Sequence, residues 1–123
     1  MELDLLTQKV IGLSIEVHKE LGPGLLESSY EACLMYELQK NGVHAKQQVL
    51  LPINYKDTKI DNGYRIDILV PNALILELKS INKILPIHIA QTLTYMKMSN
   101  IQTGLIINFN VTKLTNGLKR LKL

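Results

Sequence analysis

The chain has 123 residues, of which 46% are hydrophobic and 20% charged, a composition that excludes disorder and predicts one domain over residues 1–123. Its single cysteine, Cys33, excludes an internal disulfide and a cysteine-rich zinc site, and a net charge of +3 permits a polyanionic partner without requiring one. We see no signal peptide and no apolar run long enough to cross a membrane, and therefore expect a cytoplasmic protein without a membrane partner.

Two amphipathic helices are predicted at the start of the chain. Aliphatic residues at three- and four-residue spacing mark one stripe of the first helix: Leu6, Val10, Leu13, Val17 and Leu21. The Gly-Pro-Gly sequence at 22–24 ends this pattern. A second helical pattern then runs to a stop signal at Asn41-Gly42, and its apolar side comprises Leu26, Tyr30, Cys33, Leu34 and Leu38.

Strands follow, because from Ala45 the hydrophobic period changes to two. Residues 47–55 predict one strand in which Pro52 indicates an edge or a bulge, residues 56–57 a turn, and residues 61–63 a second turn or a bulge. Two further strands are predicted at 64–70 and 73–79, joined by a short turn.

The remaining elements complete the predicted fold. Pro86 opens a helix of roughly four turns, residues 103–109 predict a buried strand, and residues 118–123 a short edge strand. The element order is ααβββαβ, with the edge strand as an optional addition. This order predicts an α/β (α+β) fold in which helices flank a mixed β-sheet.

Two acids stand where buried strands are predicted. Burying a carboxylate without a partner is costly, so Asp67 and Glu77 should be paired, hydrogen-bonded or bound to a metal ion. Glu77 and Lys79 share one strand face because alternate side chains point the same way. If the two strands pair antiparallel, Asp67 and Glu77 lie about 5 Å apart at Cβ, close enough to share one cation.

This arrangement suits hard divalent cations. Asp67 and Glu77 would supply oxygen ligands to Mg²⁺ or Mn²⁺, with the backbone carbonyl of Leu78 and waters completing the octahedron. The metal would lower the pKa of a bound water, and Lys79 would stabilise the developing charge or orient that water. The alternative is a structural Asp–Lys or Glu–Lys bridge along a sheet edge. A sequence pattern this short more often marks such a bridge than a metal site.

The predicted third helix carries a polar pair. Gln91 and Tyr95 are four residues apart and share one face, with His88 on the same stripe, while Ile89, Leu93 and Met96 form a stripe suited to the sheet. A Gln–Tyr pair beside the acidic strands can hold the lysine, a water or a phosphate. The alternative is the polar flank of a half-buried helix.

Three residues near the first helix break have simpler interpretations. Glu27 lies three residues after a glycine N-cap, which suits the helix dipole and partial capping. Tyr30 lies on the apolar stripe and is expected in the core. His18 is expected to be a partly buried histidine with satisfied hydrogen bonds.

A family resemblance adds to this interpretation. Residues 24–30 spell G-x-x-E-x-x-Y, and the chain resembles the GxxExxY protein family of the PD-(D/E)XK nuclease superfamily. The resemblance covers almost the whole chain through five segments in order: residues 18–31 (HKELGPGLLESSYE), 64–67 (YRID), 76–79 (LELK), 91–95 (QTLTY) and 104–109 (GLIINF).

The resemblance implies a restriction-endonuclease-like core with a metal-dependent phosphodiesterase site. The positions that match the catalytic residues of the superfamily are Asp67, Glu77, Lys79, Gln91 and Tyr95. Glu27 matches an additional acid of the metal shell, contributed by the leading helix. The implied function is a Mg²⁺-dependent or Mn²⁺-dependent nuclease that uses a metal-activated water, with DNA favoured over RNA as the substrate.

Two other functions remain open at this point. The fold can serve as a non-catalytic or partner-dependent nucleic-acid-binding module, or the acids can act only as structural bridges to lysines. A homodimer is expected by analogy, because cutting both strands of a duplex needs two sites and small domains often pair.

Overall fold

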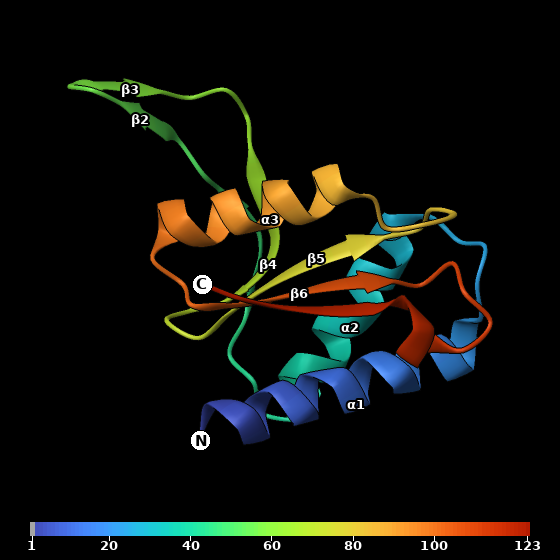
Figure 1. The fold of residues 1–123 in the computed structure, drawn as a ribbon. Helices are drawn as coiled ribbons and strands as arrows, with labels where there is room; N and C mark the ends of the chain where they lie inside the picture. Colours follow the sequence, from blue (N-terminus) through green and yellow to red (C-terminus); the bar gives the residue numbers. More distant parts are fainter. Residues whose placement is uncertain (1) are drawn as a thin grey trace.

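A computed structural model describes residues 2–123 and shows a five-stranded mixed sheet (Figure 1). The strand order is β1-β4-β5-β6-β7, and the strands are β1 (Lys46–Leu50), β4 (Arg65–Val70), β5 (Leu74–Lys79), β6 (Thr103–Asn108) and β7 (Leu118–Lys122). Only the β5–β6 pair of this sheet is parallel, and helix α3 (Pro86–Ser99) makes the crossover between these two strands. The predicted mixed sheet is confirmed.

Helices cover both faces of the sheet, as predicted. Helices α1 (Leu3–Leu21) and α2 (Glu27–Lys40) lie on one face and α3 lies on the other (Figure 1). The larger hydrophobic core packs α1 and α2 against residues such as Leu76 and Ile107. The smaller core packs α3 against Ile75 and Ile106. The two cores use alternate residues of the same strands, which is why β5 and β6 have apolar residues on both faces along most of their length.

The buried face of α1 includes most of the predicted aliphatic stripe and adds polar residues to it. It comprises Thr7, Val10, Ser14, Val17 and His18, whereas Leu21 is exposed. Thr7 and Ser14 can be buried because their hydroxyls donate hydrogen bonds to backbone carbonyls four residues earlier, at 2.9 and 2.8 Å. Val10 and Val17 of the predicted stripe are buried and Leu6 and Leu13 pack against the same core, so the predicted face is confirmed except for Leu21. The prediction missed the polar members of this face because it counted aliphatic side chains only.

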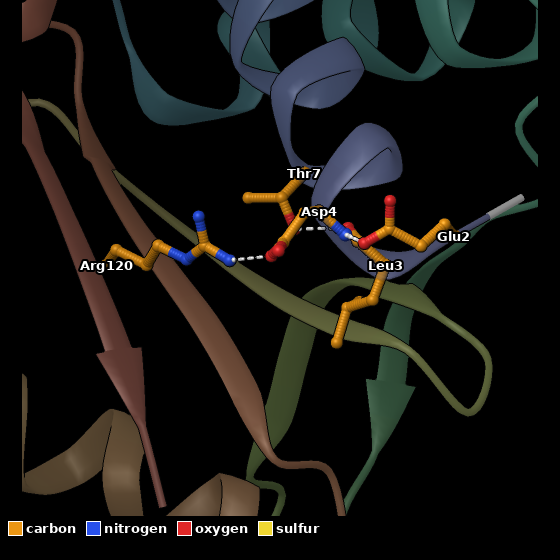
Figure 2. Close-up of polar contacts among 5 residues, drawn as sticks. All are labelled: Glu2, Leu3, Asp4, Thr7 and Arg120. Carbon is orange, nitrogen blue, oxygen red and sulfur yellow. Dashed lines mark hydrogen bonds and ion pairs between the residues drawn. The ribbon is translucent and has the colours of Figure 1, made fainter.

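The first turn of α1 is also joined to the last strand. Arg120 Nη2 lies 2.8 Å from Asp4 Oδ1 (Figure 2). Both side chains remain accessible to solvent, so this ion pair contributes little to stability. Within residues 2–123, no helix is both long and apolar enough to cross a membrane.

Tyr30 and His18 have the structural roles predicted for them. The Tyr30 ring is fully buried and stacks on Phe109, with 4.3 Å between the ring centroids. The Tyr30 hydroxyl donates to the Gly22 carbonyl at 2.6 Å and accepts from the Leu25 amide at 3.2 Å. His18 Nε2 donates to the Val111 carbonyl at 2.7 Å. Tyr30 thus holds the loop that leads into α2.

We expect Tyr30→Phe to lower the free energy of unfolding by about 1–3 kcal/mol, because the Gly22 carbonyl and the Leu25 amide lose their partner. Urea or thermal unfolding measures this change. Tyr36→Phe is the matched control, since Tyr36 lies on the same helix with its side chain exposed. Equal stability of Tyr30→Phe and the wild type would contradict the role of the hydroxyl.

The single strand predicted at 47–55 is wrong. Strand β1 ends at Leu50, and the Leu51 amide still donates to the Tyr64 carbonyl at 2.8 Å. Pro52 has no N–H, so the ladder cannot continue through it. The chain leaves the sheet and forms a separate hairpin of β2 (Ile53–Tyr55) and β3 (Thr58–Ile60), which extends beyond α3 (Figure 1).

The turn predicted at 56–57 is confirmed within this hairpin. Strand β3 was not predicted, because Thr58–Ile60 is short and lies between two turn signals. The predicted edge strand is confirmed as β7, and a short 3₁₀ helix, η1 (Leu114–Gly117), precedes it.

Candidate active site

The two predicted acids lie where strands β4 and β5 separate. The antiparallel ladder runs from Val70–Leu74 to Ile68–Leu76, and its register would place Asp67 opposite Glu77. The ladder ends before that position. Instead, Asp67 Oδ2 accepts a hydrogen bond from the Leu78 amide at 2.8 Å. A side-chain carboxylate therefore replaces the missing backbone partner and stays beside β5.

Glu77 is a buried acid with an unsatisfied oxygen. Its side chain is 5% exposed, and within residues 2–123 its Oε1 has no hydrogen-bond partner. Burial, followed by the negative charge of Asp67, raises the pKa of Glu77 to about 9, while the positive charge of Lys79 acts in the opposite direction. Without a bound cation, this carboxyl group therefore holds a proton at neutral pH.

Lys79 and the Leu78 carbonyl lie beside this acid pair. Lys79 is half-buried and follows Glu77 by two residues on the same strand. The Leu78 amide is directed toward Asp67. Because the N–H and C=O groups of one strand residue point to the same side, the Leu78 carbonyl is also directed toward the β4 side.

Glu27 contacts the end of β5 from the start of α2. Helix α2 has Leu26 as its N-cap and Glu27 as its first residue, so the predicted glycine N-cap is wrong. Gly24 has a φ of 98°, a conformation that L side chains rarely adopt, and lies in the preceding loop. Glu27 Oε2 accepts from the Ser80 amide at 3.2 Å, and Ser80 Oγ donates to the Leu25 carbonyl at 2.6 Å.

These contacts form one wall of an open cleft of about 650 Å³. Glu27 and Asp67 both line it, together with Leu25, Leu26, Ser28, Glu31, Gln48 and Ser80. Among residues 2–123, however, no three His, Cys, Asp or Glu side chains approach closely enough to hold one metal ion. The structure thus places Glu27 in the same cleft as Asp67 but does not assemble the expected three-acid ligand set.

Glu31 is a cleft residue that the sequence prediction missed. It lies one turn after Glu27 and accepts hydrogen bonds from Gln48 Nε2 at 2.7 Å and Gln47 Nε2 at 3.4 Å. Burial is the main factor that raises the pKa of Glu31, with smaller contributions from the charges of Asp67 and Glu27. The four-residue spacing of Glu27 and Glu31 was the available signal, because such residues share a helix face.

Gln48 has an unusual backbone at this site. Its φ is 52°, in the left-handed region that disfavours side chains with a Cβ. The β1–β4 register skips Gln48, which stands opposite Asp67 between the pairs Gln47–Ile68 and Val49–Ile66. Residues held in such conformations often occur at functional sites. Here the Gln48 side chain, on this backbone, donates its hydrogen bond to Glu31.

The predicted Gln91–Tyr95 pair lies on the α3 side of the acids. Gln91 Nε2 donates to Tyr95 Oη at 3.1 Å. Burial, followed by the negative charge of Glu77, raises the pKa of Tyr95. His88 does not join the pair, because its Nδ1 accepts from the Leu85 amide at the start of α3. The stripe of Ile89, Leu93 and Met96 packs in the smaller core, as predicted.

Comparison with known families shows the superfamily to which the chain belongs. A family model described as the PD-(D/E)XK nuclease superfamily matches residues 4–121. The chain belongs to this superfamily. No curated protein and no solved structure matches it. The mixed sheet flanked by helices agrees with the restriction-endonuclease-like fold of the superfamily, while the narrower GxxExxY assignment remains a prediction.

Membership of the superfamily indicates a class of chemistry against which the acid pair can be compared. Nucleases of the PD-(D/E)XK superfamily act on nucleic acid and generally use divalent metals. The residues present fit such an ion, because Glu77 has a buried oxygen without a partner, and Asp67 and the Leu78 carbonyl add oxygen donors beside it.

Proposed function

We propose that the protein is a nuclease that hydrolyses phosphodiester bonds, preferentially in DNA, with Mg²⁺ or Mn²⁺ as its cofactor. The buried, unsatisfied carboxyl group of Glu77 beside Asp67 carries this proposal. A protein gains nothing in stability from such a group, because a buried acid next to a second acid is costly unless a proton or a cation neutralises it. Superfamily membership supports the cation.

Each residue of the site would have its own role. Asp67, Glu77 and the Leu78 carbonyl would hold the cation, with Glu27 in its outer shell. When bound, such a cation supplies an acidified water and neutralises charge on the phosphate. Lys79 would stabilise the charge that develops on the phosphate oxygens during attack. Tyr95, oriented by Gln91, would hold Lys79 or a phosphate oxygen in position.

Melting and cleavage measured with and without metal test this function. We expect millimolar Mg²⁺ or Mn²⁺ to raise the melting temperature relative to EDTA, because an ion that binds only the folded state stabilises it by about 2.7 kcal/mol at a concentration 100 times its Kd. We also expect cleavage of labelled DNA oligonucleotides with metal and none with EDTA. Salt-dependent DNA binding without cleavage in either metal would instead support the non-catalytic binding module.

A further inference from the structure

A second pocket lies beside the acid pair on the α3 side of the sheet. It has a volume of about 250 Å³ and is lined by Ile53, Tyr64, Gln91, Thr94, Tyr95 and Met98. We call it the Tyr64–Tyr95 pocket. The two tyrosine rings are 6.3 Å apart at their centroids and inclined by 58°, so they form an aromatic corner. Tyr64 is 40% exposed, which leaves much of its ring open to a ligand.

The lining of the pocket selects for a flat ligand with a polar edge. None of its six side chains carries a formal charge at neutral pH, so the interior of the pocket has no cation to neutralise a phosphate, although the Tyr95 hydroxyl at its rim can still contact one. Its principal side-chain amide is that of Gln91, which uses one N–H to bond Tyr95. A side-chain amide has two N–H donors and one carbonyl acceptor, so one donor and the acceptor remain for a ligand. A nucleobase combines an apolar face with such an edge.

The pocket also lies within reach of the proposed reaction centre. Tyr64 is three residues before Asp67, a distance of about 10 Å along an extended chain. Tyr95 packs in the same small core as Ile75, which precedes Glu77 by two residues on β5. Arg65, between Tyr64 and Asp67 in the sequence, is exposed and adds a positive charge to this part of the chain.

We propose that the Tyr64–Tyr95 pocket receives one unstacked nucleobase next to the phosphodiester that is cut, so that the substrate is single-stranded or frayed nucleic acid. The inference rests on the proposed nuclease function and specifies its substrate. In an intact duplex the bases are paired and stacked, and a base must be extruded before a protein ring can stack on it. An open aromatic corner beside the acids therefore favours strands whose bases are already free.

Base stacking can be measured without cleavage. Single-stranded oligonucleotides that carry a fluorescent base analogue at successive positions are titrated with protein in EDTA at low salt. We expect fluorescence quenching at one position for the wild type and for Tyr64→Phe, which keeps the ring. We expect Tyr64→Ala to lose this quenching and to bind about 5- to 150-fold more weakly, the range associated with the loss of one base–aromatic stack.

Tyr36→Ala is the matched control, because Tyr36 is an exposed tyrosine on α2 that lies outside this pocket. Equal affinity and equal quenching for Tyr64→Ala and Tyr36→Ala would overturn the inference, as would equal binding of blunt duplexes and single strands by the wild type. These results are separate from the nuclease proposal. That proposal fails if metal supports no cleavage, whereas the stacking assay requires neither metal nor cleavage.

Discussion

Asp67→Asn is expected to reduce metal-dependent DNA cleavage by about 100-fold or more while leaving the fold intact. Asparagine keeps a carbonyl oxygen that can accept the hydrogen bond from the Leu78 amide, which Asp67 Oδ2 accepts at 2.8 Å. It lacks the negative charge with which Asp67 would attract a hard divalent cation, and a neutral amide oxygen binds such an ion more weakly than a carboxylate. The substitution therefore separates the structural role of this side chain from its proposed role in cation binding.

The measurement compares initial cleavage rates of labelled single-stranded and double-stranded oligonucleotides in Mg²⁺ and in Mn²⁺. Asp57→Asn is the matched control, because Asp57 lies in the exposed turn between β2 and β3. Unfolding curves establish that both variants fold. Cleavage by folded Asp67→Asn at the wild-type rate would exclude Asp67 from the mechanism.

Glu77→Gln is expected to raise the stability of the metal-free protein at neutral pH. The pKa of Glu77 is raised from 4.5 to about 9 on folding, mainly by burial and then by the charge of Asp67. Between these values the folded state holds a proton that the unfolded state has released. The contribution of Glu77 to the free energy of unfolding is therefore greatest below about pH 4.5 and falls as the pH rises toward 9. By linkage the loss at pH 7 is at most about 3 kcal/mol.

Glutamine removes this pH-dependent penalty because it cannot ionise. We expect a higher melting temperature than that of the wild type in EDTA at pH 7, and a smaller loss of stability between pH 5 and about 9. In Mg²⁺ the order should change, because the wild type gains stability from the ion and Glu77→Gln does not. Glu20→Gln, an exposed substitution on α1, controls for the change in net charge.

The sign of this effect separates two interpretations of the acids. If Glu77 served only as a structural bridge to Lys79, its replacement would leave that lysine unpaired and would lower stability at neutral pH. In that case metal would not change the melting temperature. A metal-free Glu77→Gln protein that melts below the wild type, with no response to Mg²⁺ in either, would contradict the proposed cation site.

The elements of the central sheet could be predicted because their patterns are local. Strands β4 and β5 are apolar runs separated by a Pro-Asn turn, and α3 begins at Pro86, as expected of a residue without an amide hydrogen. The course of residues 47–60 could not be predicted in this way. Pro52 indicated an interruption, but whether the chain would resume its ladder or leave the sheet depends on partners outside that segment.

Some residues of the candidate site could also be predicted, because their signals are local in the sequence. Asp67, Glu77 and Lys79 were recognisable as charges inside apolar strands, and Gln91 and Tyr95 as neighbours on one helix turn. Their arrangement across the fold was not recognisable. Each of these features joins segments that are far apart in the chain. They are the hydrogen bond from the Ser80 amide to Glu27, the position of Glu31 in the cleft beside Asp67, and the ring contact between Tyr64 and Tyr95.

By itself, the sequence determined the mixed sheet flanked by helices, the membership of the superfamily and the presence of two acids within the apolar strands, because these depend on hydrophobic periodicity and on residue types at fixed spacing. The tertiary structure alone decided how the acids are held. The β4–β5 ladder ends one pair early, so that Asp67 bonds the Leu78 amide and Glu77 is enclosed with one oxygen unpaired. Burial and the proximity of like charges arise only when separate strands and helices pack together, and these two factors set the chemistry of Glu77.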